Sequence, residues 1–233
     1  MTIGISVLMP LYNGIEFLEE SLHSVILQTH KKWEVIIGIN GHKEGSDIEQ
    51  KAKQIVNMYN MDNEHDIRVI YYETKGKPFT LNKMIDDIKY DYVALLDVDD
   101  AWYPLKLEKQ IPFLSRYDVV GTQCQYFGNM IGCPSIPFGD ITEFDFFTLN
   151  PVVNSSVIIH KENAYWNDVF AVDDYDMWFR LKHEGKTFYN ISDVLCKHRV
   201  YPQSSFNAVA GDFVGNVRTK WRMIYDDKGL LPK

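Results

Sequence analysis

Apolar runs alternate with amphipathic segments through the first hundred residues. Short runs rich in branched side chains occupy residues 3–8, 34–39, 67–72 and 92–96. Runs of this length are typical of strands that are buried on both faces of a parallel sheet. Their regular alternation with helical segments predicts an α/β fold, in which a mostly parallel, doubly wound central sheet is flanked by helices.

Three amphipathic segments connect these runs. Asn13 and Glu16 have the spacing of a capping box, which predicts the start of the first helix at this point. The second helix is expected over residues 47–59. The third is expected to begin near Pro78, because proline is favoured in the first turn of a helix. The loop after the first strand lacks a GxGxxG pattern, so no dinucleotide-binding fingerprint is present.

The second half of the chain has a looser pattern. Residues 126–150 are rich in Gly, Pro and Phe without a clear period, which favours a long functional loop. The remaining segments predict strands over residues 118–125, 152–160 and 188–201 and helices over residues 174–183 and 211–225. No repeat or linker interrupts the chain, so residues 1–233 are expected to form a single domain.

Three acids follow directly on the strand of residues 92–96. They are Asp97, Asp99 and Asp100, in the sequence YVALLDVDD. Ligands of open α/β sheets bind at the carboxyl ends of the strands, and carboxylate oxygens suit Mg²⁺ or Mn²⁺ together with phosphate oxygens. Taken alone, the triplet is more simply explained as an acidic surface turn, so its function depends on the other motifs.

Composition limits the classes of function. The chain has 233 residues and a formal net charge of -8, which argues against a nucleic-acid-binding protein. Its three cysteines are widely spaced and form no CxxC pair, which argues against structural zinc and favours a reducing compartment. No basic leader and no apolar run of membrane-spanning length is seen. We therefore expect a soluble, cytoplasmic protein without a transmembrane segment, and peripheral contact with a membrane stays open.

Four segments in order carry a family resemblance. They are residues 6–13 (SVLMPLYN), 18–29 (LEESLHSVILQT), 97–110 (DVDDAWYPLKLEKQ) and 172–181 (VDDYDMWFRL). Together they resemble the inverting family-2 glycosyltransferases, over roughly residues 3–205. The resemblance implies a GT-A (Rossmann-like) fold, a UDP-, GDP- or dTDP-sugar donor, and Mn²⁺ or Mg²⁺. It also implies a glycan, glycoconjugate or glycosylated protein as acceptor, with residues 1–100 as the nucleotide-binding half and residues 101–233 as the acceptor and catalytic half.

The resemblance assigns the acids unequal roles. Asp99 matches the metal ligand of the DxD segment, and Asp97 is expected to reach the metal or the ribose. Asp174 matches the catalytic base, which must deprotonate the acceptor hydroxyl on the face opposite the leaving group. Asp173 stands where the family usually has Glu. For Asp100 a metal role and a helix-capping role stay equally open.

Donor contacts are expected at the ends of the first strands and at the start of the third helix. The candidates are Pro10, Tyr12, Asn40, Lys77 and Asn82. Tyr12 is expected to stack on the base, and Lys77, with Lys75, to contact the diphosphate. Asn40 replaces the Asp that commonly reads uracil, which leaves the base open. Leu81 replaces a commonly basic residue, so that contact is not expected.

The late segment departs from the family pattern. His198 falls at the usual Tyr position and Tyr201 at the usual His position, which leaves a third metal ligand unassigned. Asn154 and Trp178 are the candidate acceptor contacts, since amides and aromatic faces suit sugars. The spacing of Trp178 from Leu181 fits a core residue equally well.

Two other classes of protein share parts of this pattern. A haloacid dehalogenase-type phosphatase would need Thr where this chain has Ala101. The main alternative is a degenerate, non-catalytic module that binds a sugar nucleotide or a glycan. Asp97, Asp99 and Asp174 are all present, which favours the enzyme.

Overall fold

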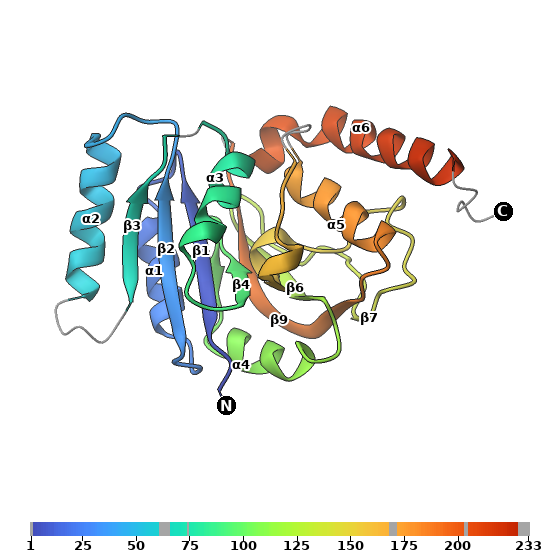
Figure 1. The fold of residues 1–233 in the computed structure, drawn as a ribbon, viewed down its shortest axis with the longest axis horizontal. Helices are drawn as coiled ribbons and strands as arrows, with labels where there is room; N and C mark the ends of the chain where they lie inside the picture. The colour runs from blue at the N-terminus through green and yellow to red at the C-terminus, as the bar shows by residue number, and fades with distance from the viewer. Residues whose placement is uncertain (1, 61–65, 74, 168–171, 203–204, 228–233) are drawn as a thin grey trace.

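A nine-stranded sheet runs through the part of the chain that the computed structural model describes, namely residues 2–60, 66–73, 75–167, 172–202 and 205–227 (Figure 1). Its main path comprises β3 (Ile67–Tyr71), β2 (Trp33–Ile39), β1 (Ile5–Leu11), β4 (Tyr92–Leu95), β8 (Ile158–His160), β6 (Val119–Gly128), β9 (Phe188–Val200) and β5 (Ala101–Trp102). The short β7 (Gly139–Asp140) pairs with β9 off this path.

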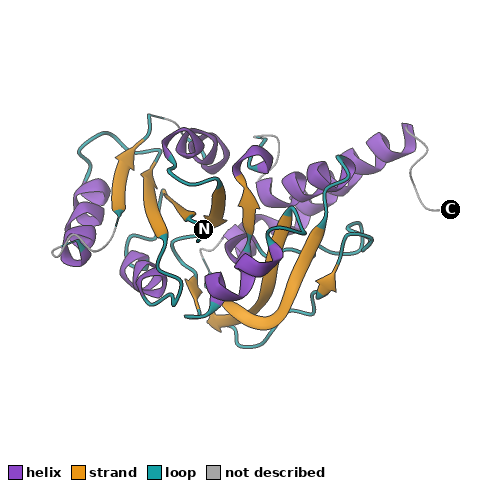
Figure 2. Cartoon of the chain, turned by 60° about the horizontal axis from the view of Figure 1, so that its bottom comes forward, coloured by secondary structure: helices purple, strands orange, loops and turns teal. Residues whose placement is uncertain are grey.

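Helices cover both faces of the sheet (Figures 1 and 2). They are α1 (Leu18–Ile26), α2 (Asp47–Tyr59), α3 (Lys77–Met84), α4 (Lys106–Gln110), α5 (Asp173–His183) and α6 (Ser205–Asp227). In Figure 1, α2 lies at the β3 edge of the sheet, and α6 extends across the opposite end above α5. The fold is thus an α/β sandwich with the predicted arrangement of helices around a central sheet.

The parallel half follows from the alternation of side chains along its strands. β1 pairs in parallel with β2 and β4, and β2 pairs in parallel with β3. Successive residues of a strand face opposite sides of the sheet. Val7 and Met9 accordingly share a core cluster with Leu22 of α1, whereas Leu8 shares another with Met84 of α3. Both faces are buried, which is why these strands are apolar at nearly every position.

The second half of the sheet is mixed rather than parallel. β8 runs antiparallel to both β4 and β6, and β6 runs parallel to the long β9. The register between β6 and β9 shifts on either side of Gln123, and β9 is strongly curved where it passes beneath the helices (Figure 2). Near its carboxyl end β9 contacts the segment that follows β4, where the Arg199 main-chain N–H donates to Asp100.

Several predicted boundaries are wrong. The first helix begins at Leu18 rather than at Asn13, because Gly14, with φ of +86°, opens a turn in which the Phe17 N–H donates to the Gly14 carbonyl at 2.9 Å. The strand predicted over residues 152–160 is confined to β8, because Asn154–Ser156 form a 3₁₀ turn. The short β5 was not predicted. The helix that the family resemblance implies after the DxD segment is present as α4, which has only five residues.

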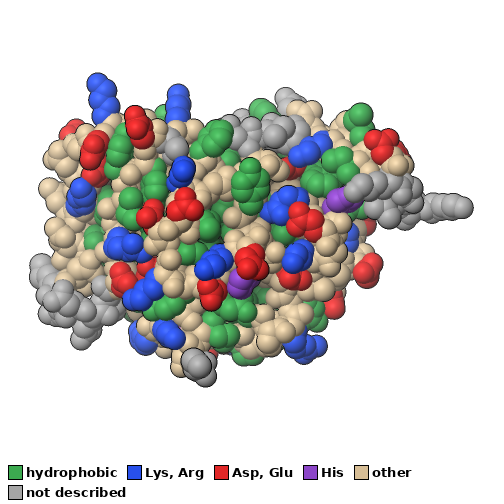
Figure 3. All heavy atoms as spheres, in the orientation of Figure 1, with side chains coloured by type: hydrophobic (Ala, Val, Ile, Leu, Met, Phe, Trp, Pro, Cys, Tyr) green, Lys and Arg blue, Asp and Glu red, His purple; other side chains and the backbone are tan. Residues whose placement is uncertain are grey.

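Other predictions are confirmed. The fold class is α/β, the helix predicted over residues 47–59 has those bounds, and the helix that begins near Pro78 is α3. α5 begins one residue before its predicted start. On the face shown in Figure 3, acidic and basic side chains are interspersed. No helix among the described residues is long and apolar enough to cross a membrane.

Candidate active site

The predicted acids lie at the carboxyl end of β4. Asp97 to Asp100 form a tight turn there, in which the Asp100 N–H donates to the Asp97 carbonyl at 3.0 Å. The first turns of α3 and α5 lie at the same end of the sheet (Figure 1). This is the edge at which open α/β sheets bind ligands.

Asp97 is held by α3 and by the 3₁₀ turn Asn154–Ser156. Its carboxylate pairs with Lys77 of α3 at 2.5 Å and accepts a hydrogen bond from the Asn154 side chain at 3.2 Å. Its main-chain N–H donates to the Ser155 hydroxyl at 3.1 Å. Burial disfavours the charged carboxylate, but Lys77 and Asn154 outweigh this effect and hold the pKa of Asp97 below its ordinary value. Asp97 is therefore ionised at neutral pH.

The pKa of Asp99 is shifted in the opposite direction from that of Asp97. Burial, followed by the charges of Asp100 and Asp97, raises the pKa of Asp99 to about 6. The Tyr201 hydroxyl hydrogen-bonds to the Asp99 carboxylate, and the Arg199 side chain donates to the Asp99 carbonyl at 2.9 Å. A cation next to Asp99 would relieve the repulsion between these carboxylates.

Asp100 connects two strands of the sheet and does not cap a helix. It is 2% exposed, and its two oxygens accept hydrogen bonds from His198 Nδ1 at 3.1 Å and from the Arg199 main-chain N–H at 2.8 Å. Burial disfavours the imidazolium, but Asp100 outweighs it and raises the pKa of His198 to about 9. The pair joins the end of β4 to β9. The proposed capping role is wrong, since α4 begins only at Lys106.

The second acid cluster lies in the first turn of α5. Asp174 accepts a hydrogen bond from the Asn150 side chain at 3.3 Å, and burial raises its pKa although Lys77 opposes this effect. Asp173 is 9% exposed, and its Oδ2 has no hydrogen-bond partner in the described part of the chain. Burial raises the pKa of Asp173 to about 6. The charge of Lys77 opposes this rise, so Asp173 lies in the same electrostatic field as Asp174.

Lys77 connects the two clusters. Its side chain is 34% exposed, and its ammonium contacts Asp97 directly. Burial disfavours its charge, but the carboxylates of Asp97, Asp173 and Asp174 together raise the pKa of Lys77 well above its ordinary value. A single cation thus lies within the field of acids from β4 and from α5. The fold brings Asp97, Asp99, Lys77 and Asp174 to one site, as the sequence predicts.

The nucleotide-side candidates lie where β1 and β2 end. The exposed Tyr12 ring lies 5.2 Å from the His42 ring, centroid to centroid, and covers Gly41. A Cβ at Gly41 would approach the Tyr12 ring to 2.7 Å, so glycine is required beneath it. Pro10 is partly buried in β1, whereas Asn40 is only 2% exposed. Tyr12 therefore offers an accessible stacking face, and Asn40 offers very little surface to a ligand.

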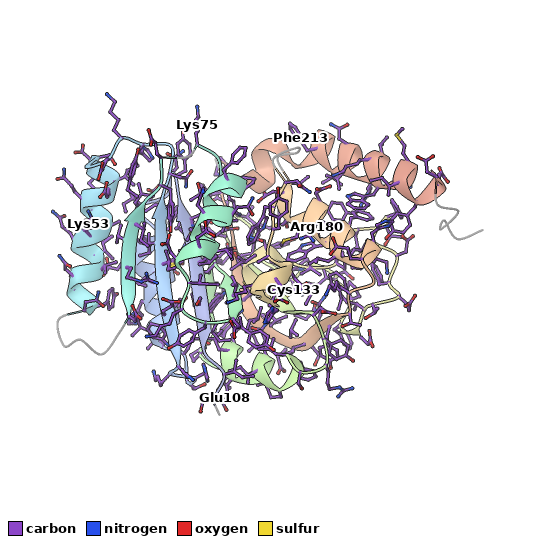
Figure 4. The ribbon with its side chains drawn as sticks, viewed as in Figure 1. Lys53, Lys75, Glu108, Cys133, Arg180 and Phe213 are labelled. Atoms are coloured by element: carbon purple, nitrogen blue, oxygen red, sulfur yellow. The ribbon has the colours of Figure 1, made fainter. Side chains whose placement is uncertain are left out.

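Three residues that were expected to contact the acceptor or the sugar donor lie in other environments. Trp178 is fully buried in a core cluster, so it cannot contact an acceptor. The side-chain amide of Asn82 donates to the Trp166 carbonyl at 2.8 Å and accepts from the Trp166 N–H at 2.9 Å. Asn82 thus holds the main chain at Trp166 instead of facing the sugar donor. Lys75 projects outward from the loop before α3 (Figure 4).

Sequence reasoning missed several residues that support the acids. Asn150 orients Asp174, yet it lies in a segment without periodicity, and no sequence signal marks it. Asn154 is expected at the acceptor, but its contact is with Asp97. The pairing of His198 with Asp100 joins residues that are distant in sequence, so only the topology reveals it.

The metal-ligating capacity of the site is limited. Among the described residues, no three His, Cys, Asp or Glu side chains are grouped so as to hold a metal ion. Asp97 and Asp99 supply two carboxylates at one turn. Mg²⁺ and similar hard cations are commonly held by one or two carboxylates together with water and substrate phosphates. The residues present fit a cation that is completed by a phosphorylated ligand.

The sheet topology is that of the GT-A fold, which two solved glycosyltransferase structures share. Staphylococcus aureus TarS 1–349 in complex with UDP-GlcNAc superposes with a TM-score of 0.76 at 18% identity, covering 98% of this chain and 70% of that one. A Pyrobaculum calidifontis mannosyltransferase, PcManGT, in complex with GDP-Man and Mn²⁺ has a TM-score of 0.65 at 13% identity, covering 98% and 76% of the two chains.

The sequence comparisons identify the family. The model of glycosyl transferase family 2 matches residues 6–208, and the chain therefore belongs to this family. Putative teichuronic acid biosynthesis glycosyltransferase TuaG of Bacillus subtilis is 28% identical, covering 86% of this chain and 80% of that protein. O-antigen biosynthesis glycosyltransferase WbnJ of Escherichia coli is also 28% identical, covering 86% and 81%. These findings support a glycosyltransferase over the non-catalytic binding module.

Proposed function

We propose that this glycosyltransferase moves one sugar from a nucleotide-sugar donor to an acceptor hydroxyl, with inversion at the anomeric carbon and with Mn²⁺ or Mg²⁺ as cofactor. The observation that carries the proposal is the contact of Lys77 with Asp97, within the field of Asp173 and Asp174. It links the acids suited to a metal–diphosphate with an acid suited to proton transfer. Complexes of two structural neighbours with UDP-GlcNAc and with GDP-Man and Mn²⁺ support the donor class.

On the donor side, Asp99 and Asp97 would hold the metal. When bound, such an ion stabilises the negative charge of a diphosphate leaving group as a Lewis acid. Lys77 adds a fixed positive charge next to Asp97, and its ammonium is positioned to bind a phosphate oxygen. Tyr12 offers its exposed ring to the nucleobase. In this proposal residues 1–100 bind the nucleotide, and residues 101–233 supply the base and the acceptor site.

On the acceptor side, Asp174 acts as the base. Its carboxylate takes the proton of the acceptor hydroxyl while that oxygen forms a bond to the anomeric carbon. The bond from the anomeric carbon to the phosphate oxygen breaks, and its electron pair leaves with the nucleoside diphosphate. Asp174 is partly exposed, whereas Asp173 is buried, so Asp174 is the acid that an acceptor can reach. Its raised pKa brings its basicity closer to that of a neutral-pH catalyst.

The acceptor is proposed to be a glycan or glycoconjugate. The names of the two relatives refer to the biosynthesis of teichuronic acid and of O-antigen, which favours this class. Asn154 borders the site through its contact with Asp97 and remains a candidate acceptor contact. The absence of a QxxRW motif from the sequence favours transfer of one sugar over processive synthesis. We place the reaction in the cytoplasm, where nucleotide sugars serve as donors.

A donor panel with three variants tests the proposal. UDP-GlcNAc, UDP-glucose, GDP-mannose and dTDP-glucose are screened by thermal shift with Mn²⁺, and turnover of the stabilising donor is then measured. Asp174→Asn should abolish turnover and leave donor affinity within about twofold, because it removes only the proton acceptor. Asp99→Asn should weaken Mn²⁺-dependent donor binding as well. Asp193→Asn, which alters an exposed acid paired with Lys109, is the matched control and should behave as wild type.

Equal loss of binding and turnover in Asp174→Asn and Asp99→Asn would contradict this division of roles. Donor binding without any turnover in the wild-type protein, unchanged in Asp174→Asn, would instead support a binding module.

A further inference from the structure

α6, with 23 residues the longest helix in the described part of the chain, has no role in the proposed chemistry. It lies across α5 at the end of the sheet (Figure 1). Val217 and Trp221 are buried against α5, and the Trp221 and Phe179 rings are stacked at an interplanar angle of 11°. α6 therefore packs against the helix that carries Asp174.

The polar contacts of α6 are concentrated on the first turn of α5. Asp176 is 1% exposed and accepts hydrogen bonds from Lys220 Nζ at 2.6 Å and from Trp221 Nε1 at 2.8 Å. Arg218 Nε donates to the Tyr175 hydroxyl at 3.1 Å. Tyr175 is 1% exposed, and its own hydroxyl donates to the Phe146 carbonyl. These residues directly follow the proposed base in the sequence.

Arg218 also contacts the segment before α5. Its Nη2 donates to the Thr148 carbonyl at 3.0 Å. Two positions further on, the side-chain amide of Asn150 donates to Asp174 Oδ2 at 3.3 Å. One guanidinium therefore holds both the residue that follows Asp174 and the short segment that presents its hydrogen-bond donor.

We propose that Arg218 is a positioning residue for the base, acting through Tyr175 and through the Thr148–Asn150 segment. This inference rests on the proposed role of Asp174. A guanidinium is planar and presents its donors in a fixed fork, so it can bind two acceptors on two elements at once, whereas an ammonium is a flexible point charge. Fixing Asn150 fixes the orientation of the Asp174 carboxylate, and displacement of a reacting group by about 1 Å can cost roughly 100-fold in rate.

The contact of Arg218 with the Thr148–Asn150 segment should also affect the pH dependence of turnover. The hydrogen bond from Asn150 lowers the pKa of Asp174, against burial, which raises it. Lys77 of α3, Asp97 at the end of β4 and Asp173 of α5 also face this carboxylate. Loosening the Asn150 contact should raise the pKa of Asp174 and move the acid limb of the turnover profile to higher pH.

The test is Arg218→Met, which retains the aliphatic stem of the side chain. With the most rapidly hydrolysed of UDP-GlcNAc, UDP-glucose and GDP-mannose, and with water as acceptor, kcat should fall about 10- to 100-fold. KM for the donor should stay within about twofold, because the donor contacts lie on the other half of the chain. Arg218→Lys should recover only part of kcat. Arg222→Met is the matched control, since the Arg222 guanidinium lies 5.5 Å from the Phe147 ring centroid instead of bridging Tyr175 and Thr148.

Unchanged kcat in Arg218→Met would overturn the inference, as would an equal loss in Arg222→Met. Arg218→Met could also lose activity only because it unfolds. If its kcat equals that of wild type at temperatures below its own Tm, the role of Arg218 is purely structural and the inference is overturned. Asp174→Asn is measured in parallel. If Asp174→Asn remains active, the proposed function fails by itself; if it is inactive while Arg218→Met is normal, only the role of Arg218 fails.

Discussion

Lys106 is a buried cation whose removal should change the stability of the protein in a pH-dependent way. It is the first residue of α4 and is fully buried. Its ammonium lies 4.0 Å from the Trp102 ring centroid and donates to Gln110 Oε1 at 2.8 Å, so its nearest partners are uncharged. Burial lowers the pKa of Lys106 from 10.5 to about 7.

The free energy involved follows from this difference in pKa. Since one pKa unit corresponds to about 1.4 kcal/mol, protonating Lys106 in the folded state costs roughly 5 kcal/mol relative to the unfolded chain. Between pH 7 and pH 10.5 the unfolded chain binds more protons than the folded one. The free energy of unfolding therefore rises with pH in this window, and between pH 7.5 and pH 9.5 the Lys106 contribution should rise by roughly 2–3 kcal/mol.

Lys106→Met is the matching perturbation, because it keeps the length of the side chain and removes the amine. Urea unfolding at pH 7.5 and at pH 9.5 should show that wild type gains roughly 2–3 kcal/mol relative to Lys106→Met over this interval. Lys109→Met, on the exposed face of the same helix, should follow wild type. If the stability of Lys106→Met rises with pH in parallel with wild type, the folded protein does not contain a destabilised cation at this position, and the reasoning is refuted.

Three further variants test other parts of the account. Trp178→Ala should lower the free energy of unfolding by about 3–5 kcal/mol, measured by urea titration, while KM for the acceptor stays unchanged, because Trp178 lies in the core. In the metal-free protein, His198→Gln should lower Tm more at pH 6 than at pH 10. Asp100 raises the pKa of His198 to about 9. The stabilisation of the folded protein by the His198–Asp100 pair is therefore complete below pH 6.5 and is lost as the pH rises through about 9. Lys77→Met should raise KM for the donor roughly 10- to 100-fold in steady-state kinetics, because one charge-assisted hydrogen bond to a phosphate is lost.

The sequence predicts the first half of the fold well for a physical reason. Residues 47–59 have a clear helical period, and the apolar strand of residues 33–39 is buried at every position, so local pattern and tertiary environment agree. The acids of the site could also be found, because carboxylates that follow a buried strand have few structural explanations once the other motifs are present. Lys77, Asp97 and Asp174 accordingly meet at one site.

The second half could not be predicted to the same depth, because its residues have roles that depend on distant partners. Trp178 has the spacing of a core residue and the chemistry of a sugar contact, and only the packing of α5 decides between them. The amide of Asn82 is committed to the main chain of Trp166, across more than eighty residues. The antiparallel β8 and the turn at Asn154 follow from pairing with β4 and β6, which no local period records.

The anomeric configuration of the first product tests the central claim most directly. Hydrolysis of an α-linked UDP-sugar by the wild-type protein with Mn²⁺ can be followed by proton NMR at early times, before the free sugar mutarotates. Inverting transfer with Asp174 as base predicts that the β anomer forms first and that Asp174→Asn forms neither anomer. Initial release of the α anomer, or undiminished release by Asp174→Asn, would contradict the account.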